Sequence, residues 1–96
     1  IPHKVAVMDL SIRDQVVANL KQVLREVSTV LPTENISDSH DLLDHGEWGE
    51  SLDLLCTQLY EYEVPLSKDL YQLIDTTGRM MKMEPSGWDY LGELIQ

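Results

Sequence analysis

Basic residues are scarce in this 96-residue chain, which holds 7 lysines and arginines against 17 aspartates and glutamates. Proteins that bind nucleic acid or anionic membranes need basic patches, so the formal charge of −10 argues against both kinds of ligand. Cysteine occurs once, at Cys56, which excludes an intramolecular disulfide and suits a reducing compartment. No apolar run approaches the roughly 20 residues that a membrane-spanning helix needs. The composition therefore predicts a cytoplasmic protein that binds neither nucleic acid nor a membrane.

Positive charge is missing altogether between Glu34 and Glu63, a stretch without lysine or arginine. Like-charged residues three or four apart on a helix destabilise it by about 0.2–0.5 kcal/mol per pair, so a fold that keeps such a row is expected to have a cationic partner. The alternative is a solvated face that only keeps the protein soluble. The stretch carries nine carboxylates, the first seven at intervals of three or four residues: Glu34, Asp38, Asp41, Asp44, Glu47, Glu50, Asp53, Glu61 and Glu63.

The spacing of apolar residues predicts an all-α fold, a small antiparallel bundle of four to five helices that forms a single domain over residues 1–96. The first helix is expected over residues 9–31, with Ser11 as its cap and Pro32 as its end. Residues 1–8 are expected to form an irregular leader. The apolar stripe of this first helix consists of Val16, Leu20, Val23, Leu24, Val27 and Leu31.

Three further helices and a closing segment follow from capping and breaking residues. A short helix is expected from residues 37–39 to about His45, with Gly46 as a left-handed C-cap. A third is expected over residues 47–62, closed by Pro65, and a fourth is capped by Ser67 and weakened at Gly78. The buried stripes are predicted to be Trp48, Leu52, Leu55, Cys56 and Leu59 on the third helix, then Leu70, Leu73, Ile74, Thr77 and Met81 on the fourth, with Trp88, Leu91 and Ile95 in the closing segment.

A candidate interface lies on the outward face of the third predicted helix. There Glu47, Glu50 and Glu61 share a face with Leu54, and Asp53 lies at its edge. An apolar residue ringed by carboxylates is typical of an interface anchor with a charged rim. Contact between Leu54 and a neighbouring helix of the same bundle is an equally good interpretation.

Tyr60 and Tyr62 form a second candidate cluster, at the end of the same predicted helix. Tyrosine is enriched at interfaces because it joins a large apolar ring to a hydrogen-bonding hydroxyl. Both rings flank the core stripe, so they either anchor a partner or are half-buried. The predicted partner-binding set is Asp41, Asp44, Glu47, Glu50, Asp53, Leu54, Tyr60, Glu61 and Tyr62.

No constellation in the sequence predicts catalysis, a cofactor or a metal. Cys56 falls on a core stripe, where it has no base to activate it. His40, Asp41, Asp44 and His45 have i, i+4 spacings that can place two ligands on one metal, but an exposed helix end explains the same residues. There is no glycine-rich phosphate loop. The chain is therefore expected not to be an enzyme, and to hold neither a cofactor nor a metal.

Residues 46–67 (GEWGESLDLLCTQLYEYEVPLS) have a Gly-Glu turn that opens a helix, a leucine and small-residue core stripe, and an acidic Tyr-Glu exit. A Gly and Met-rich turn follows at residues 77–83, and a closing Trp-Asp-Tyr-Leu at residues 88–91. This half of the chain resembles the MafI-like group of small helical immunity proteins from bacterial polymorphic-toxin systems, which are related in role to contact-dependent-inhibition immunity proteins.

The resemblance implies a non-catalytic inhibitor that binds the C-terminal domain of a cognate toxin. Such toxins are commonly nucleases, here with a ribonuclease favoured, and a nuclease must attract phosphates with lysine and arginine. An acidic surface would therefore complement its target. The alternative is an acidic adaptor or regulatory module that binds a basic segment of a protein unrelated to toxins.

Overall fold

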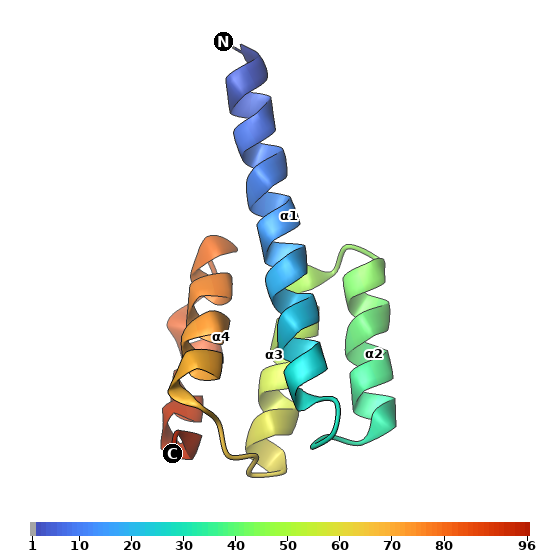
Figure 1. Ribbon diagram of the computed structural model, residues 1–96, viewed down its shortest axis with the longest axis vertical. Helices are drawn as coiled ribbons and strands as arrows, with labels where there is room; N and C mark the ends of the chain where they lie inside the picture. The colour runs from blue at the N-terminus through green and yellow to red at the C-terminus, as the bar shows by residue number, and fades with distance from the viewer. Residues whose placement is uncertain (1) are drawn as a thin grey trace.

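Four antiparallel helices and a short closing segment make up the computed structural model, which describes residues 2–96, with side chains described from Ile12 onward. Successive helices run in opposite directions, and the N-terminal part of the first extends beyond the others (Figure 1). Within the described residues there is no strand, only an isolated bridge between Leu66 and Ile95. The predicted all-α antiparallel bundle is confirmed. Its elements are α1 (Pro2–Val27), α2 (Thr33–Asp44), α3 (Trp48–Glu61), α4 (Lys68–Met80) and two 3₁₀ segments, η1 (Pro85–Gly87) and η2 (Asp89–Leu94).

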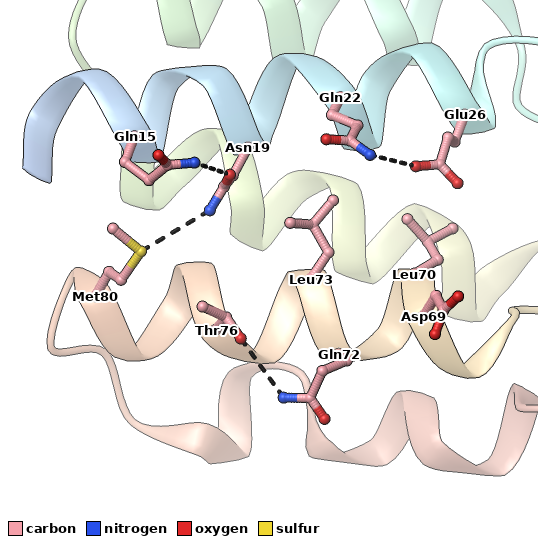
Figure 2. A pocket seen from close by; sticks show the side chains of 10 residues that line it. All are labelled: Gln15, Asn19, Gln22, Glu26, Asp69, Leu70, Gln72, Leu73, Thr76 and Met80. Carbon is pink, nitrogen blue, oxygen red and sulfur yellow. Dashed lines mark hydrogen bonds between the residues drawn. The ribbon is translucent and has the colours of Figure 1, made fainter.

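Between α1 and α4, polar side chains line a groove (Figure 2). The amides there are paired within the protein: Gln15 donates to Asn19 at 2.7 Å, and Asn19 donates in turn to the Met80 sulfur at 3.8 Å. On the same helix Gln22 donates to Glu26. Asn19 is buried, and its bond to Met80 is the one of these three that joins α1 to α4. A buried amide is costly to leave unpaired, so this contact favours the observed packing of the two helices.

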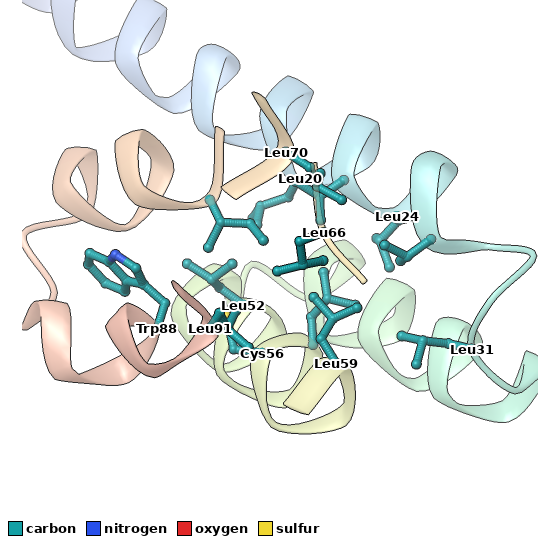
Figure 3. Packing of buried hydrophobic residues seen from close by; sticks show 14 of the residues in the cluster. Leu20, Leu24, Leu31, Leu52, Cys56, Leu59, Leu66, Leu70, Trp88 and Leu91 are labelled. Carbon is teal, nitrogen blue, oxygen red and sulfur yellow. The ribbon is translucent and has the colours of Figure 1, made fainter. Parts of the chain in front are cut away.

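One continuous apolar core joins the helices and the closing segment (Figure 3). All six residues of the predicted α1 stripe are buried, and so are Leu52, Leu55, Cys56 and Leu59 of α3. On α4, Leu70, Ile74 and Thr77 are buried while Leu73 and Met81 are half-buried. The closing segment adds Trp88 and Leu91, both with no exposed surface. Trp48 and Ile95, which were also expected to be buried, are half-buried. Helical periodicity therefore identified most of the core residues of these elements.

Two predicted helix caps are confirmed by hydrogen bonds. The backbone N–H of Leu70 donates to the Ser67 hydroxyl at 3.0 Å, which opens α4. Gly46 has a φ of +77° and donates to the Leu43 carbonyl, while Glu47 donates to the Leu42 carbonyl at 2.8 Å. These two bonds form the Schellman motif, which satisfies the last carbonyls of a helix. They turn the chain sharply from α2 into α3.

Three predicted boundaries are wrong. The α1 helix begins at Pro2, so residues 2–8 are helical and do not form an irregular leader. Ser11 therefore lies inside the helix and is not its cap. Ile1 lies outside the described residues. The same helix ends at Val27, where a turn begins, instead of continuing to Leu31. Pro32 opens α2: its carbonyl accepts from Asn35 at 3.0 Å, so α2 starts several residues before the expected 37–39 cap. Pro32 is the N-cap of α2, a position where the missing N–H of proline breaks no helical hydrogen bond.

The expected cap residue Ser39 instead joins α2 to α3. Its hydroxyl donates to the Ser51 carbonyl at 3.0 Å, and the Ser51 hydroxyl donates to the Ser39 carbonyl at 2.8 Å. Both serines have no exposed surface. Small side chains with reciprocal bonds let two helices approach closely, so the relative position of α2 and α3 is well determined.

Candidate functional site

The acidic stretch forms the outer surface of α2, α3 and the loops at their ends. All nine of its carboxylate residues are exposed. Among the described side chains the one ion pair, between Asp75 and Arg79, lies on α4 and uses none of the nine. Because exposed charges of one sign repel one another, this surface has a negative potential that no cation of the described part of the chain neutralises at contact distance.

Within this surface a hollow lies between α2 and α3. We call it the acidic groove; it is lined by Asp38, Asp41, Leu42, His45, Glu47 and Glu50. The imidazole ring of His45 is held in place by a hydrogen bond, in which its Nδ1 donates to the backbone carbonyl oxygen of Asp41 at 2.7 Å. The half-buried Leu42 provides an apolar contact among the four carboxylates. Three residues of the predicted set, Asp41, Glu47 and Glu50, are therefore brought together.

Glu47 and Glu50 interact directly within the acidic groove. The pKa of Glu50 is raised because the Glu47 carboxyl is within hydrogen-bonding reach and because the negative charge of Glu47 disfavours a second charge beside it. Desolvation and the charge of Asp53 raise the pKa of Glu50 further. A cation bound here would relieve this repulsion.

The structure separates the other predicted residues from the acidic groove. Asp44 is exposed at the C-terminus of α2, and Tyr62 is 53% exposed just after α3; neither lines a described hollow. Asp53 lies beside Gly87 of η1 and does not line the acidic groove, although its charge acts on Glu50. Leu54 is half-buried and lines neither the acidic groove nor the hollow around Glu61.

Tyr60 and Glu61 belong to a second hollow, between α3 and η2, which we call the tyrosine notch; it is lined by Thr57, Tyr60, Glu61 and Tyr90. The rings of Tyr60 and Tyr90 meet edge to face, with centroids 5.0 Å apart and an interplanar angle of 88°. The hydroxyl of Tyr60 donates to a carboxylate oxygen of Glu93 at 3.3 Å. Tyr60 and Glu61 therefore line a different hollow from Asp41, Glu47 and Glu50.

Sequence reasoning missed several lining residues for different reasons. Asp38 was visible as part of the regular acidic row, and Leu42 as an apolar residue off the core stripe. Tyr90 had no local signal, because it meets Tyr60 from 30 positions further along the chain. Only the placement of η2 against α3 reveals the contact.

The single cysteine is buried and is not an activated nucleophile. Burial raises the pKa of the Cys56 thiol to about 12, with a smaller contribution from the charge of Asp53, so the thiol stays protonated at neutral pH. Among residues whose side chains are described, no three His, Cys, Asp or Glu side chains converge on a position that could hold a metal ion. No described helix is long and apolar enough to cross a membrane.

Comparison with known proteins gives no relative for this chain: no protein-family model, curated protein or solved structure matches it. The resemblance to immunity proteins therefore stays a prediction from residues 46–91. The acidic groove, with four carboxylates, and the tyrosine notch, with two aromatic rings and Glu61, are the features from which a function can be inferred.

Proposed function

We propose that this protein is an immunity protein, which binds a basic nuclease toxin domain through the acidic surface of α2 and α3 and thereby neutralises it. The observation that carries the proposal is the acidic groove, where Asp41, Glu47 and Glu50 lie together without a cation of the described chain in contact. The resemblance of residues 46–91 to immunity proteins supplies the class of partner, with a ribonuclease favoured. A cytoplasmic location and the lack of catalytic activity belong to the same proposal.

Inhibition in this proposal is electrostatic competition. A nuclease binds phosphates through lysine and arginine, so carboxylates presented in a similar arrangement compete for the same side chains. Complementary charge also accelerates association, which matters for an inhibitor that must act before the toxin reaches nucleic acid. The strong negative charge of the chain, −10 in all, provides that steering.

Rigid presentation of the acidic groove supports the same function. The two helices that line it are joined by the reciprocal Ser39–Ser51 bonds and by the turn at Gly46. A surface that is already in its binding conformation loses less conformational entropy when a partner binds. Both features favour tight binding by an interface built mainly from charges.

The test begins with identification of the partner, by affinity capture and by co-expression with the product of the adjacent gene. A toxin should kill cells when it is expressed alone and should be tolerated when this protein is co-expressed. Calorimetric titration at low and high salt should then show tight, salt-sensitive binding. Reversal of three charges in the acidic groove, Asp41→Lys with Glu47→Lys and Glu50→Lys, is expected to weaken binding about 100-fold or more.

The matched control reverses three exposed carboxylates outside the acidic stretch, at Asp14, Glu26 and Glu84, so that the total charge changes equally. The control should lose only the part of the affinity that comes from long-range attraction. Equal affinities of the two triple variants would reject the acidic groove as the binding site. Capture of a harmless basic protein instead of a toxin would reject immunity and favour the acidic adaptor.

A further inference from the structure

The tyrosine notch combines aromatic rings with negative charge. Tyr60 is 43% exposed and Tyr90 is half-buried, and their edge-to-face contact leaves part of the Tyr60 ring open to solvent. The face of an aromatic ring carries partial negative charge, so it attracts cations. The notch is thus an apolar hollow with a preference for positive charge.

Carboxylates around the notch strengthen this preference. Glu61 lines the hollow, and Glu93 accepts the hydrogen bond from the Tyr60 hydroxyl. The negative charge of Glu93 is the main reason that the pKa of Tyr60 is raised, and Glu63 adds to it. No lysine or arginine is among the described residues that line the notch. An uncharged apolar side chain of a partner, placed in the notch, would remove these carboxylates from water without supplying an opposite charge, which is unfavourable.

We propose that the tyrosine notch receives the guanidinium group of an arginine side chain of the basic partner. The planar guanidinium stacks on the Tyr60 ring, while its N–H groups donate to the carboxylates of Glu61 and Glu93. Lysine fits less well, because its ammonium is compact, strongly hydrated and unable to stack. This inference rests on the proposed function, and it adds a binding site whose residues are all distinct from those of the acidic groove.

The experiment compares oligo-arginine and oligo-lysine peptides of equal length and charge, titrated against the whole protein at low salt. Wild-type protein is expected to bind oligo-arginine more tightly than oligo-lysine. Tyr60→Leu should weaken oligo-arginine binding about threefold to tenfold and leave oligo-lysine binding nearly unchanged. Tyr60→Phe keeps the ring and loses the hydroxyl, so it should retain the preference for arginine.

Tyr62→Leu is the matched control, because Tyr62 is also an exposed tyrosine near the end of α3 but lines no described hollow. It should change neither titration. Urea denaturation of each variant establishes that the fold is kept. If the tyrosine pair only holds η2 against α3, Tyr60→Leu will lower stability without changing the preference between the peptides, and the inference is overturned.

Failure of this inference and failure of the proposed function give different results. Equal binding of both peptides, weakened equally by Glu47→Gln with Glu50→Gln, would retain the acidic groove as a cation site and reject arginine recognition by the notch. Absence of binding of either peptide would reject both. A preference for arginine that Tyr60→Leu abolishes and Tyr60→Phe retains would establish the notch as the arginine site.

Discussion

Gly78 determines how the closing segment packs, although it was expected only as a weak point of α4. It lies inside the helix, and a Cβ atom built there would overlap the ring of Trp88. The indole N–H of Trp88 donates to the Asp75 carboxylate at 2.9 Å, and Arg79 donates to the same carboxylate. The pKa of Asp75 is lowered, chiefly by the bond from Trp88. One glycine and one carboxylate on α4 therefore place the buried tryptophan.

We expect Gly78→Ala to destabilise the protein by about 1–3 kcal/mol, because the added methyl group displaces the Trp88 ring. The loss should occur even though alanine favours helix over glycine by roughly 0.5–1 kcal/mol. Urea denaturation measures the change, and near-ultraviolet circular dichroism reports the indole environment. Gly49→Ala is the control: a Cβ there meets Met83 at an ordinary 3.6 Å, so this variant should keep or slightly increase stability.

The α3 helix ends in a Schellman motif without glycine. Glu63 has a φ of +49°, and the backbone N–H groups of Glu63 and Val64 donate to the carbonyls of Tyr60 and Leu59. A side chain in this left-handed conformation is strained, and a negative charge at a helix C-terminus is opposed by the helix dipole. Both effects act against the motif that orients the loop into α4.

We expect Glu63→Gly to stabilise the protein by about 0.5–1 kcal/mol, because glycine adopts the positive φ without a Cβ clash. Glu63→Gln separates the two causes, since it removes the charge and keeps the strained conformation. Thermal denaturation of the three proteins measures the difference. If Glu63→Gln stabilises the protein as much as Glu63→Gly does, the negative charge and not the backbone strain is what destabilises this helix end.

The helices were predictable from sequence where one local signal had one meaning. Periodic leucines gave the buried faces of α1, α3 and α4, and Ser67 and Gly46 gave two helix ends. Pro32 misled because proline can end one helix or begin the next. Ser39 misled because a serine suits both a helix cap and a close helix contact.

The candidate site was predictable only in part for a related reason. The periodic carboxylates gave the sign of the surface and the exposed positions of the acidic groove. A helical wheel of one element could not show that α2 contributes to that groove, or that η2 contributes Tyr90 to the other hollow. Surfaces formed by two elements depend on packing, which the pattern of a single element does not contain.

Charge repulsion across the whole surface connects stability with binding. Nine exposed carboxylates on adjoining elements repel one another, and salt screens this repulsion over about 10 Å at 0.1 M. The raised pKa of Glu50 is the local sign of this effect. Residues that attract a cationic partner should therefore lower the stability of the free protein.

Glu50→Gln tests this relation between stability and binding. The pKa of Glu50 is raised above 4.5 in the folded protein, so the folded state binds its proton more tightly than the unfolded state. The stability of the wild type should therefore rise as pH falls through this range, and the cost of the charged form is fully present at neutral pH. We expect the variant to melt at a higher temperature than the wild type at neutral pH. The difference should vanish well below pH 4.5, where Glu50 is protonated in both the folded and the unfolded state.

The same substitution should weaken binding of oligo-lysine and oligo-arginine at neutral pH, because it removes one of the carboxylates that a cation would neutralise. Glu84→Gln provides the comparison, since Glu84 is exposed and lies outside both hollows. Glu50→Gln should raise the melting temperature and lower the peptide affinity, and both changes should be much smaller for Glu84→Gln. This result would indicate that the Glu47–Glu50 pair favours binding at a cost in stability. Equal changes in the two variants would contradict a special role for this pair and would attribute the effects to total charge.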